Sequence, residues 1–194
     1  MQPARLVLAS SSPRRRELLT RAGYVFAVDA ADIDETMSSD EGAAEATARL
    51  AIEKAQVVLA RCAPDDVVLA ADTAVVVEDR ILGKPSGSAQ AAEMILSLSG
   101  RNHHVLTAWA VLVPAGLAVS GVCRSTVRMR EISHAAAREY ADTAEPLDKA
   151  GAYAAQGIGK RFIAAIEGPL DNVIGLPVAP VARALARAGI RPSS

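Results

Sequence analysis

Three arginines stand where the sequence predicts the start of a helix. Ser12 is typical of a helix N-cap and Pro13 of a first helical position. The first turn then holds Arg14, Arg15 and Arg16. Cations at this end of a helix oppose its dipole, whereas guanidinium groups and free backbone amides together bind anions. We therefore expect the turn to bind a polyphosphate, with a solvated basic turn as the alternative.

Asp72 lies between two apolar runs, residues 67–71 and 75–77. We expect it at the end of a central strand, where ligand sites form in α/β sheets. A carboxylate at such a place can bind a divalent cation or take a proton from water. The alternative is a turn aspartate that accepts hydrogen bonds from nearby amides.

An acidic cluster in a predicted loop contains Asp32, Asp34 and Glu35. Mg²⁺ in proteins is often held by one or two carboxylates together with substrate phosphates, so these residues are candidate metal ligands. A solvated acidic loop is the alternative. Lys54 lies on the largely apolar stretch of a long predicted helix, and its position alone does not indicate a function.

Lys84 stands between Gly83 and Pro85, after a predicted hairpin turn. Its ammonium group suits a phosphate contact, and a solvated surface lysine is the alternative. The segment is not the phosphate-binding loop of strand-to-helix NTPases, because the spacing GxxxxGK[ST] is absent.

A Gly- and Ala-rich run over residues 151–157 contains one amide side chain, that of Gln156. Small residues let the backbone approach a ligand closely, and an amide offers a donor and an acceptor to the edge of a base. A tight structural turn is the alternative. His103 and His104 have no nucleophile motif beside them, so we interpret them as structural.

The elements that must position these residues alternate between strands and helices. Strands are predicted over residues 6–9, 24–28, 67–71, 74–77, 81–82, 105–113, 117–130 and 161–166. Helices are predicted over residues 14–22, 41–62, 88–98 and 133–140, and from 176 to the residues before Gly189, with Ser88 and Ser133 as N-caps. The alternation favours an α/β fold with a mixed sheet. No linker divides the chain, so we expect one domain over residues 1–194.

Composition limits the classes of partner. The chain has 194 residues, of which 51% are hydrophobic and 22% charged, which excludes a disordered chain. A net charge of -1 and 3% aromatic residues argue against nucleic acid and anionic membranes as partners. The sequence has no long apolar run and no signal-peptide pattern, so we expect a soluble, cytoplasmic protein. Two cysteines, Cys62 and Cys123, disfavour a disulfide framework and a zinc site.

Taken together, these segments resemble the Maf family of nucleoside triphosphate pyrophosphatases. They occur in the family's order and span nearly the whole chain: LASSSPRRRELL (residues 8–19), ADT (71–73), GKP (83–85), DKAGAYAAQG (148–157) and NVIGLP (172–177). The resemblance implies an α/β fold similar to that of ITPases. In this fold a mixed central sheet is flanked by helices, and a single domain has two lobes with a cleft between them.

The resemblance also implies a hydrolase acting on acid anhydrides, which converts a nucleoside triphosphate to the monophosphate and diphosphate. The cofactor is a divalent cation, Mg²⁺ or Mn²⁺. By match to the family, Asp72 is the proton acceptor that activates water, and Glu35 is a further acidic site residue. Both are expected to hold the metal, and which of them is ligand and which is base stays open. The other matching active-site positions are Ser10, Arg15, Lys54 and Lys84. The resemblance further suggests a homodimer.

Three positions separate family members that prefer dTTP and UTP from those that prefer 7-methyl-GTP. Here they are Arg14, Thr73 and Gln156, and all three resemble the pyrimidine type. The amide of Gln156 has a physical rationale, because it can pair with the O4 and N3–H edge of uracil. We therefore expect dTTP and UTP as substrates.

Two other functions are considered. One is a nucleotide-binding regulator of cell division without turnover, since the family was named for an association with septum formation. The intact Glu35, Asp72 and Lys84 argue against a dead enzyme. The other is a house-cleaning enzyme for deaminated purine triphosphates such as ITP, on a similar fold. The order of rates on different triphosphates separates this function from hydrolysis of dTTP and UTP. A similar fold does not separate them.

Overall fold

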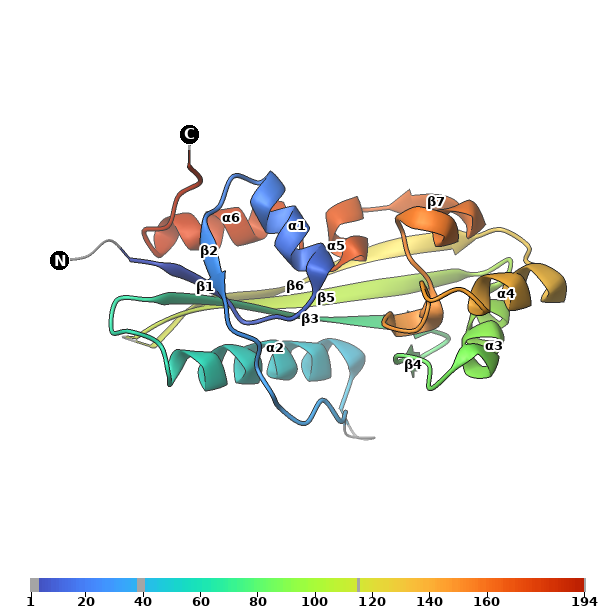
Figure 1. Ribbon diagram of the computed structural model, residues 1–194, viewed down its shortest axis with the longest axis horizontal. Helices are drawn as coiled ribbons and strands as arrows, with labels where there is room; N and C mark the ends of the chain where they lie inside the picture. Colours follow the sequence, from blue (N-terminus) through green and yellow to red (C-terminus); the bar gives the residue numbers. More distant parts are fainter. Residues whose placement is uncertain (1–3, 38–40, 115, 194) are drawn as a thin grey trace. The chain divides into compact units, whose positions relative to one another are not determined.

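Strands and helices alternate along the chain, as the sequence predicts (Figure 1). The computed structural model describes residues 4–37, 41–114 and 116–193. The strands are β1 (Leu6–Leu8), β2 (Phe26–Val28), β3 (Val67–Val77), β4 (Arg80–Leu82), β5 (Asn102–Val113), β6 (Gly116–Met129) and β7 (Ile163–Glu167). The helices are α1 (Pro13–Arg21), α2 (Ala43–Leu59), α3 (Ser88–Leu98), α4 (His134–Ala141), α5 (Leu170–Ile174) and α6 (Val178–Arg187). Two short 3₁₀ segments are η1 (Ala150–Ala152) and η2 (Gly157–Phe162).

The sheet is mixed, which confirms the predicted fold class. Its strands follow the order β2-β1-β3-β5-β6-β7, and β4 pairs with β3. Strand β1 runs parallel to both β2 and β3, whereas β4 is antiparallel to β3 and β7 antiparallel to β6. None of the helices in the described ranges is long and apolar enough to cross a bilayer.

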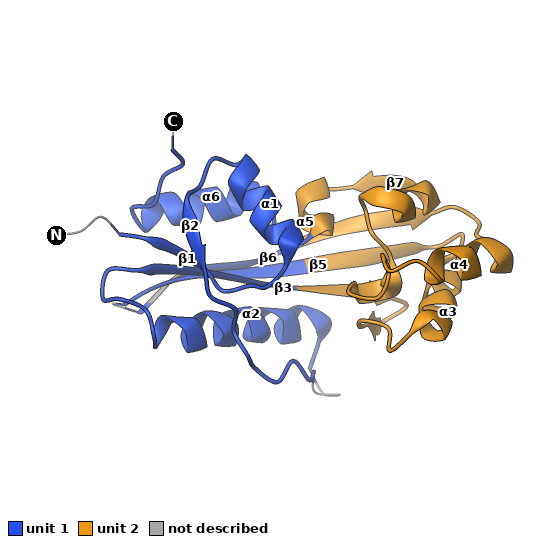
Figure 2. Cartoon of the chain, viewed as in Figure 1, with its two compact units in different colours: residues 1–72, 107–123, 175–194 blue, residues 73–106, 124–174 orange. Residues whose placement is uncertain are grey.

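The chain divides into two compact units, each built from several segments (Figure 2). Unit 1 comprises residues 1–72, 107–123 and 175–194, and unit 2 comprises residues 73–106 and 124–174. Strands β3, β5 and β6 contribute residues to both units. The single domain over residues 1–194 and the cleft between two lobes stay predictions.

In unit 1, β1 and the part of β3 that belongs to this unit bury both of their faces. Side chains alternate between the faces of a strand, so Leu8 and Leu69 join one apolar cluster while Val68 joins another. The first cluster includes side chains from α1 and α6, and the second includes side chains from α2. Figure 1 shows α2 on one side of these strands and α1 and α6 on the other. A parallel strand covered on both faces reads as a continuous apolar run, which is why residues 6–9 and 67–71 could be found from sequence.

Unit 2 has its own core. Side chains of α3 and α4 pack with the parts of β3, β5 and β6 that belong to this unit. Its largest fully buried side chains are Tyr140, Ile95, Leu98 and His103. The 3₁₀ segment η1 packs against α3.

The predicted end of a strand at Asp72 is wrong. The sequence suggested two short strands interrupted at Asp72 and Thr73, but β3 is a single strand of 11 residues. Asp72 therefore lies in the interior of a strand and not at its end. The strand continues through it because the buried carboxylate is paired with Lys54, at 2.6 Å, and because the β-branched Thr73 suits a pleated strand.

Two helix predictions also need correction. The N-cap of α3 is Gly87 and not Ser88, which is the first helical residue. Just before the helix, the backbone amide of Ser86 donates to the side-chain oxygen of Gln90, at 2.6 Å. Helix α5 was not expected, since five residues are too few to show a helical period. The N-caps at Ser12 and Ser133 are confirmed, because each hydroxyl accepts from a backbone amide three residues on.

Candidate active site

The ammonium group of Lys54 joins two of the predicted carboxylates in unit 1. Its Nζ lies 2.6 Å from Asp72 Oδ1 and 2.7 Å from Glu35 Oε1. The side chains of Lys54 and Asp72 are 8% and 10% exposed, whereas that of Glu35 is 50% exposed. A helix, a strand and a loop thus contribute one residue each to a single charged cluster with an inner and an outer carboxylate.

The periods of α2 and β3 explain this meeting. Lys54 shares the buried face of α2 with Ala51, Ala55 and Val58. Asp72 follows Val68 and Ala70 at intervals of two residues, which places it on the strand face that packs against α2. Lys54 and Asp72 therefore meet for the same reason that the apolar residues around them meet.

Arg15 is anchored by other parts of unit 1. Its Nε donates to the carbonyl oxygen of Gly175 at 2.9 Å, and its Nη1 donates to Ser10 Oγ at 3.2 Å. Burial lowers the pKa of the Arg15 guanidinium, and the negative charges of Asp72 and Glu35 act in the opposite direction. Arg15 therefore lies within electrostatic range of both carboxylates, and its orientation is set by the chain itself.

The backbone amides at the start of α1 are not all free, contrary to the expectation from sequence. The amide of Arg15 donates to Ser12 Oγ at 3.5 Å, and the amide of Arg16 donates to the Ser12 carbonyl at 3.2 Å. A capping serine satisfies the same amides that an anion would use. Any anion affinity of this turn must therefore come mainly from the arginine side chains.

The acidic loop does not form a cluster of three ligands. Asp34 Oδ1 accepts from the amide and the hydroxyl of Thr36, at 2.9 and 2.6 Å, and Asp32 is exposed. Within the described part of the chain, no three His, Cys, Asp or Glu side chains gather as a metal-binding group. Glu35 and Asp72 together still suit Mg²⁺ or Mn²⁺, which are often bound through one or two carboxylates with substrate phosphates supplying further oxygens.

The three remaining predicted residues, Thr73, Lys84 and Gln156, belong to unit 2. Thr73 is half-buried on β3, Lys84 is exposed, and Gln156 is half-buried at the N-cap of η2. The structure therefore brings together Ser10, Arg15, Glu35, Lys54 and Asp72 in unit 1, with Arg14 beside Arg15 in the chain.

Within unit 2, the segments that carry Lys84 and Gln156 are connected. The amide of Gly151 donates to the carbonyl oxygen of Gly83 at 3.0 Å, next to Lys84. Gly151 has a φ of +68°, and a Cβ there would lie 2.9 Å from Val75 Cγ1. The Gly- and Ala-rich run over residues 151–157 was expected to bring its backbone close to a ligand. At Gly151 the backbone instead lies close to strand β3 of the same chain.

His103 is buried against Tyr153, in line with its structural interpretation. Its Nε2 lies 2.7 Å from the Tyr153 hydroxyl, and the two rings meet edge to face. Burial lowers the pKa of His103 from 6.5 to about 4. The imidazole is therefore neutral at physiological pH.

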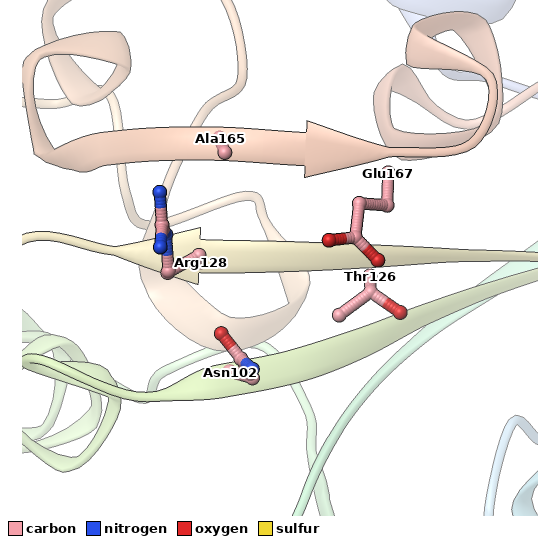
Figure 3. Close-up of a pocket in the computed structure, with 5 residues that line it drawn as sticks. All are labelled: Asn102, Thr126, Arg128, Ala165 and Glu167. Atoms are coloured by element: carbon pink, nitrogen blue, oxygen red, sulfur yellow. The ribbon is translucent and has the colours of Figure 1, made fainter.

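Unit 2 also has a shallow pocket of about 150 Å³ on β5, β6 and β7 (Figure 3). Its lining residues are Asn102, Thr126, Arg128, Ala165 and Glu167. None of the predicted site residues lines it. One cation and one carboxylate share its wall, so it shows no selectivity for an anion.

Sequence reasoning missed Tyr140 and Glu145, whose side chains hold the loop around Gln156. Tyr140 lies on α4 and reads as an ordinary core aromatic, while Glu145 lies in a turn. The available signal was the pair of glycines that follows Gln156, Gly157 and Gly159.

Comparison with known proteins adds independent evidence. The family described as Maf-like protein matches residues 5–188. A dTTP/UTP pyrophosphatase of Myxococcus xanthus is 47% identical over 191 residues, covering 95% of this chain and 93% of the relative. A dTTP/UTP pyrophosphatase of Vibrio parahaemolyticus is 45% identical over 173 residues, covering 89% of this chain and 91% of the relative.

A solved structure confirms the fold. It is the nucleoside-triphosphatase / dITP/XTP pyrophosphatase of Mycobacterium abscessus, which matches with a TM-score of 0.50 over 94% of this chain and 93% of that one. The two sequences are 18% identical, so this likeness shows a shared fold and nothing more. The family match and the relatives at 45–47% identity, each over nearly the full length, make this chain a member of the Maf family.

Proposed function

We propose that this chain hydrolyses dTTP and UTP to the nucleoside monophosphate and diphosphate. The names of the full-length relatives support the reaction and the substrates. The observation that carries the proposal is the Lys54–Asp72 pair, with Glu35 on its exposed side. A buried carboxylate held by a buried cation has the character of a positioned general base.

Asp72 would accept the proton of the attacking water. Lys54 engages Oδ1, so Oδ2 is the oxygen that would take this proton. The water would attack the α-phosphorus, and the diphosphate would leave. The pairing with Lys54 keeps the carboxylate in one orientation, which is what a near-attack geometry requires.

Arginine and lysine side chains would bind the triphosphate. Arg15 is already held by Ser10 and Gly175, so little side-chain entropy is lost when it meets a phosphate. Arg14 and Lys84 would supply further positive charge. Cations that are in place before the reaction stabilise the charge that develops on the leaving diphosphate.

A divalent cation, Mg²⁺ or Mn²⁺, would be held by Glu35 and Asp72 together with phosphate oxygens. When bound, such an ion neutralises phosphate charge and polarises a phosphoryl oxygen. A chelator should abolish turnover and Mg²⁺ should restore it. Activity that survives exhaustive chelation would contradict this part of the proposal.

Gln156, Thr73 and Arg14 would select the base. The Gln156 amide matches the acceptor–donor edge of uracil and thymine. We further propose that the enzyme acts as a homodimer in the cytoplasm, on free nucleotides rather than on nucleic acid or a membrane. The net charge of -1 supports the last point.

The test is a product assay. Purified protein is incubated with UTP, dTTP, CTP, GTP, ITP and 7-methyl-GTP, first with Mg²⁺ and then with Mn²⁺, and the products are resolved by chromatography. We expect monophosphate and diphosphate from UTP and dTTP. In ¹⁸O-water the label should appear in the monophosphate; label in the diphosphate would refute attack at the α-phosphorus.

The same assay decides between the alternatives. A higher rate on ITP than on UTP would favour a house-cleaning role on deaminated purines. Nucleotide binding without turnover on any triphosphate would favour a regulatory role. The relatives named for dTTP and UTP argue against both.

A further inference from the structure

The backbone around Gln156 is held by two side chains of unit 2, Tyr140 and Glu145. The Glu145 carboxylate accepts from the Tyr140 hydroxyl at 2.7 Å. It also accepts from the amide of Ile158 at 3.0 Å and from that of Gly159 at 2.8 Å. These amides lie two and three residues after Gln156.

The Tyr140 hydroxyl extends the same network to the other side of Gln156. It accepts from the amide of Ala154 at 3.2 Å, two residues before Gln156. The backbone is therefore held on both sides of this residue by one phenol–carboxylate pair. We call Tyr140 and Glu145 the loop clamp.

The glycines of the segment are explained by the loop clamp. Gly157 has a φ of +75°, and a Cβ there would collide with Glu145 Oε1. A Cβ on Gly159 would lie 2.6 Å from the Tyr140 hydroxyl oxygen. At Gly159 the backbone of Ala154 would also lie 2.8 Å from that Cβ. Both positions therefore need glycine, because the clamp and the backbone that it holds occupy the space of a side chain.

The preceding turn is fixed as well. The Tyr153 hydroxyl is bound to His103, and the amide of Gly151 to the Gly83 carbonyl. Ala152 is fully buried with a φ of +56°, a conformation that a non-glycine residue adopts at a cost. Such strain is retained where the surroundings over-determine the backbone, and it concentrates at functional sites.

We propose that Tyr140 and Glu145 are positioning residues that set base selectivity by fixing the backbone that presents Gln156. The inference rests on the proposed function, because it takes Gln156 as the residue that meets the base. A glycine-containing loop is intrinsically free to move, and an amide that reads a base edge must be held closely in place. A clamp that binds backbone amides on both sides of Gln156 supplies that restraint.

The principal variant is Glu145→Gln. It has nearly the same shape, but it loses the charge that strengthens three hydrogen bonds. We expect kcat/KM for UTP and dTTP to fall about tenfold, mainly through KM, while the residual rate on GTP stays unchanged. Tyr140→Phe, which removes only the hydroxyl, should shift the same ratio in the same direction.

The matched control is Glu139→Gln on α4. Glu139 is an exposed carboxylate paired with Arg161, at 3.2 Å, and its side chain is 72% exposed. The substitution removes the same charge close by in the chain without touching the loop clamp. The UTP-to-GTP ratio should stay at its wild-type value.

A double-mutant cycle separates positioning from a general structural role. In a Gln156→Ala background, Glu145→Gln should change kcat/KM for UTP by less than about twofold, because the clamp acts through the missing side chain. Hydrogen exchange without nucleotide should also become faster at the amides of Ile158 and Gly159 in Glu145→Gln.

Two results would overturn the proposal. One is an equal loss on UTP and GTP, and the other is an undiminished tenfold effect in the Gln156→Ala background. If Glu145→Gln does not fold, Tyr140→Phe is judged by the same criteria. Wild-type turnover of UTP is measured first and by itself decides the proposed function, so the two failures are distinguishable.

Discussion

Lys54 and Asp72 form an ion pair inside unit 1, with Nζ 2.6 Å from Oδ1 and both side chains at most 10% exposed. A buried charge left without its partner is strongly destabilising. We propose that the pair acts both in activity and in stability, and the variants that follow test each role.

Asp72→Asn keeps the shape of the side chain and removes its ability to take a proton. We expect kcat on UTP to fall by about 10² to 10⁴, the usual contribution of a positioned base. Steady-state kinetics measure this. Asp66→Asn is the matched control, because Asp66 is also a buried carboxylate in unit 1, paired with Arg5 at 2.7 Å. Its kcat should stay near wild type, and a similar loss in both variants would remove Asp72 from the mechanism.

Lys54→Met leaves the buried Asp72 carboxylate without its cation. The free energy of unfolding should fall by about 3 kcal/mol, measured by urea denaturation. Adding Asp72→Asn to this variant removes the uncompensated charge, so the double variant should recover part of the loss. A double variant whose loss equals the sum of the single losses would show that the two side chains do not interact.

Gln156→Glu replaces a donor–acceptor amide with an acceptor-only carboxylate. Activity on UTP should fall far more than activity on 7-methyl-GTP, because the carboxylate no longer matches the uracil edge. Parallel kinetics with the two substrates give the ratio. An equal loss on both would exclude Gln156 from base selection.

His103 makes stability depend on pH. Its pKa is lowered from 6.5 to about 4 by burial, so between these values the unfolded chain binds the proton and the folded chain does not. Stability therefore rises with pH across that window. We expect His103 to account for a loss of about 2 kcal/mol between pH 7 and pH 4.5.

His103→Gln keeps a hydrogen-bonding group beside Tyr153 and removes the titration. Urea denaturation at a series of pH values should give a flatter profile for this variant between pH 4.5 and 6.5. Superimposable profiles for variant and wild type would show that His103 titrates normally in the fold.

Local patterns were sufficient for much of the fold and for part of the site. The apolar run at residues 67–71 and the serine N-caps at Ser12 and Ser133 are set by neighbours in the chain, so they could be predicted. The continuity of β3 through Asp72 could not be, because it depends on a lysine 18 residues away in the sequence. The acidic loop likewise suggested three ligands, and only Glu35 is bound to Lys54.

The loop clamp shows the same limit. Glu145 has no periodic signal, and its carboxylate is satisfied by amides 13 and 14 residues further along the chain. From the sequence, the small residues of 151–157 were expected to let the backbone approach a ligand closely. In the fold, a Cβ on Gly157 would instead meet the Glu145 side chain of the loop clamp.

The hydrogen bond between Arg15 and the Gly175 carbonyl spans 160 residues. Helix α6, which follows Gly175, also shares an apolar cluster with β1 and α1. During synthesis, residues up to Gly175 must therefore leave the ribosome before Arg15 acquires its second anchor. Incomplete chains that stop before Gly175 lack this anchor, so Arg15 acquires the orientation seen in the fold only late in translation.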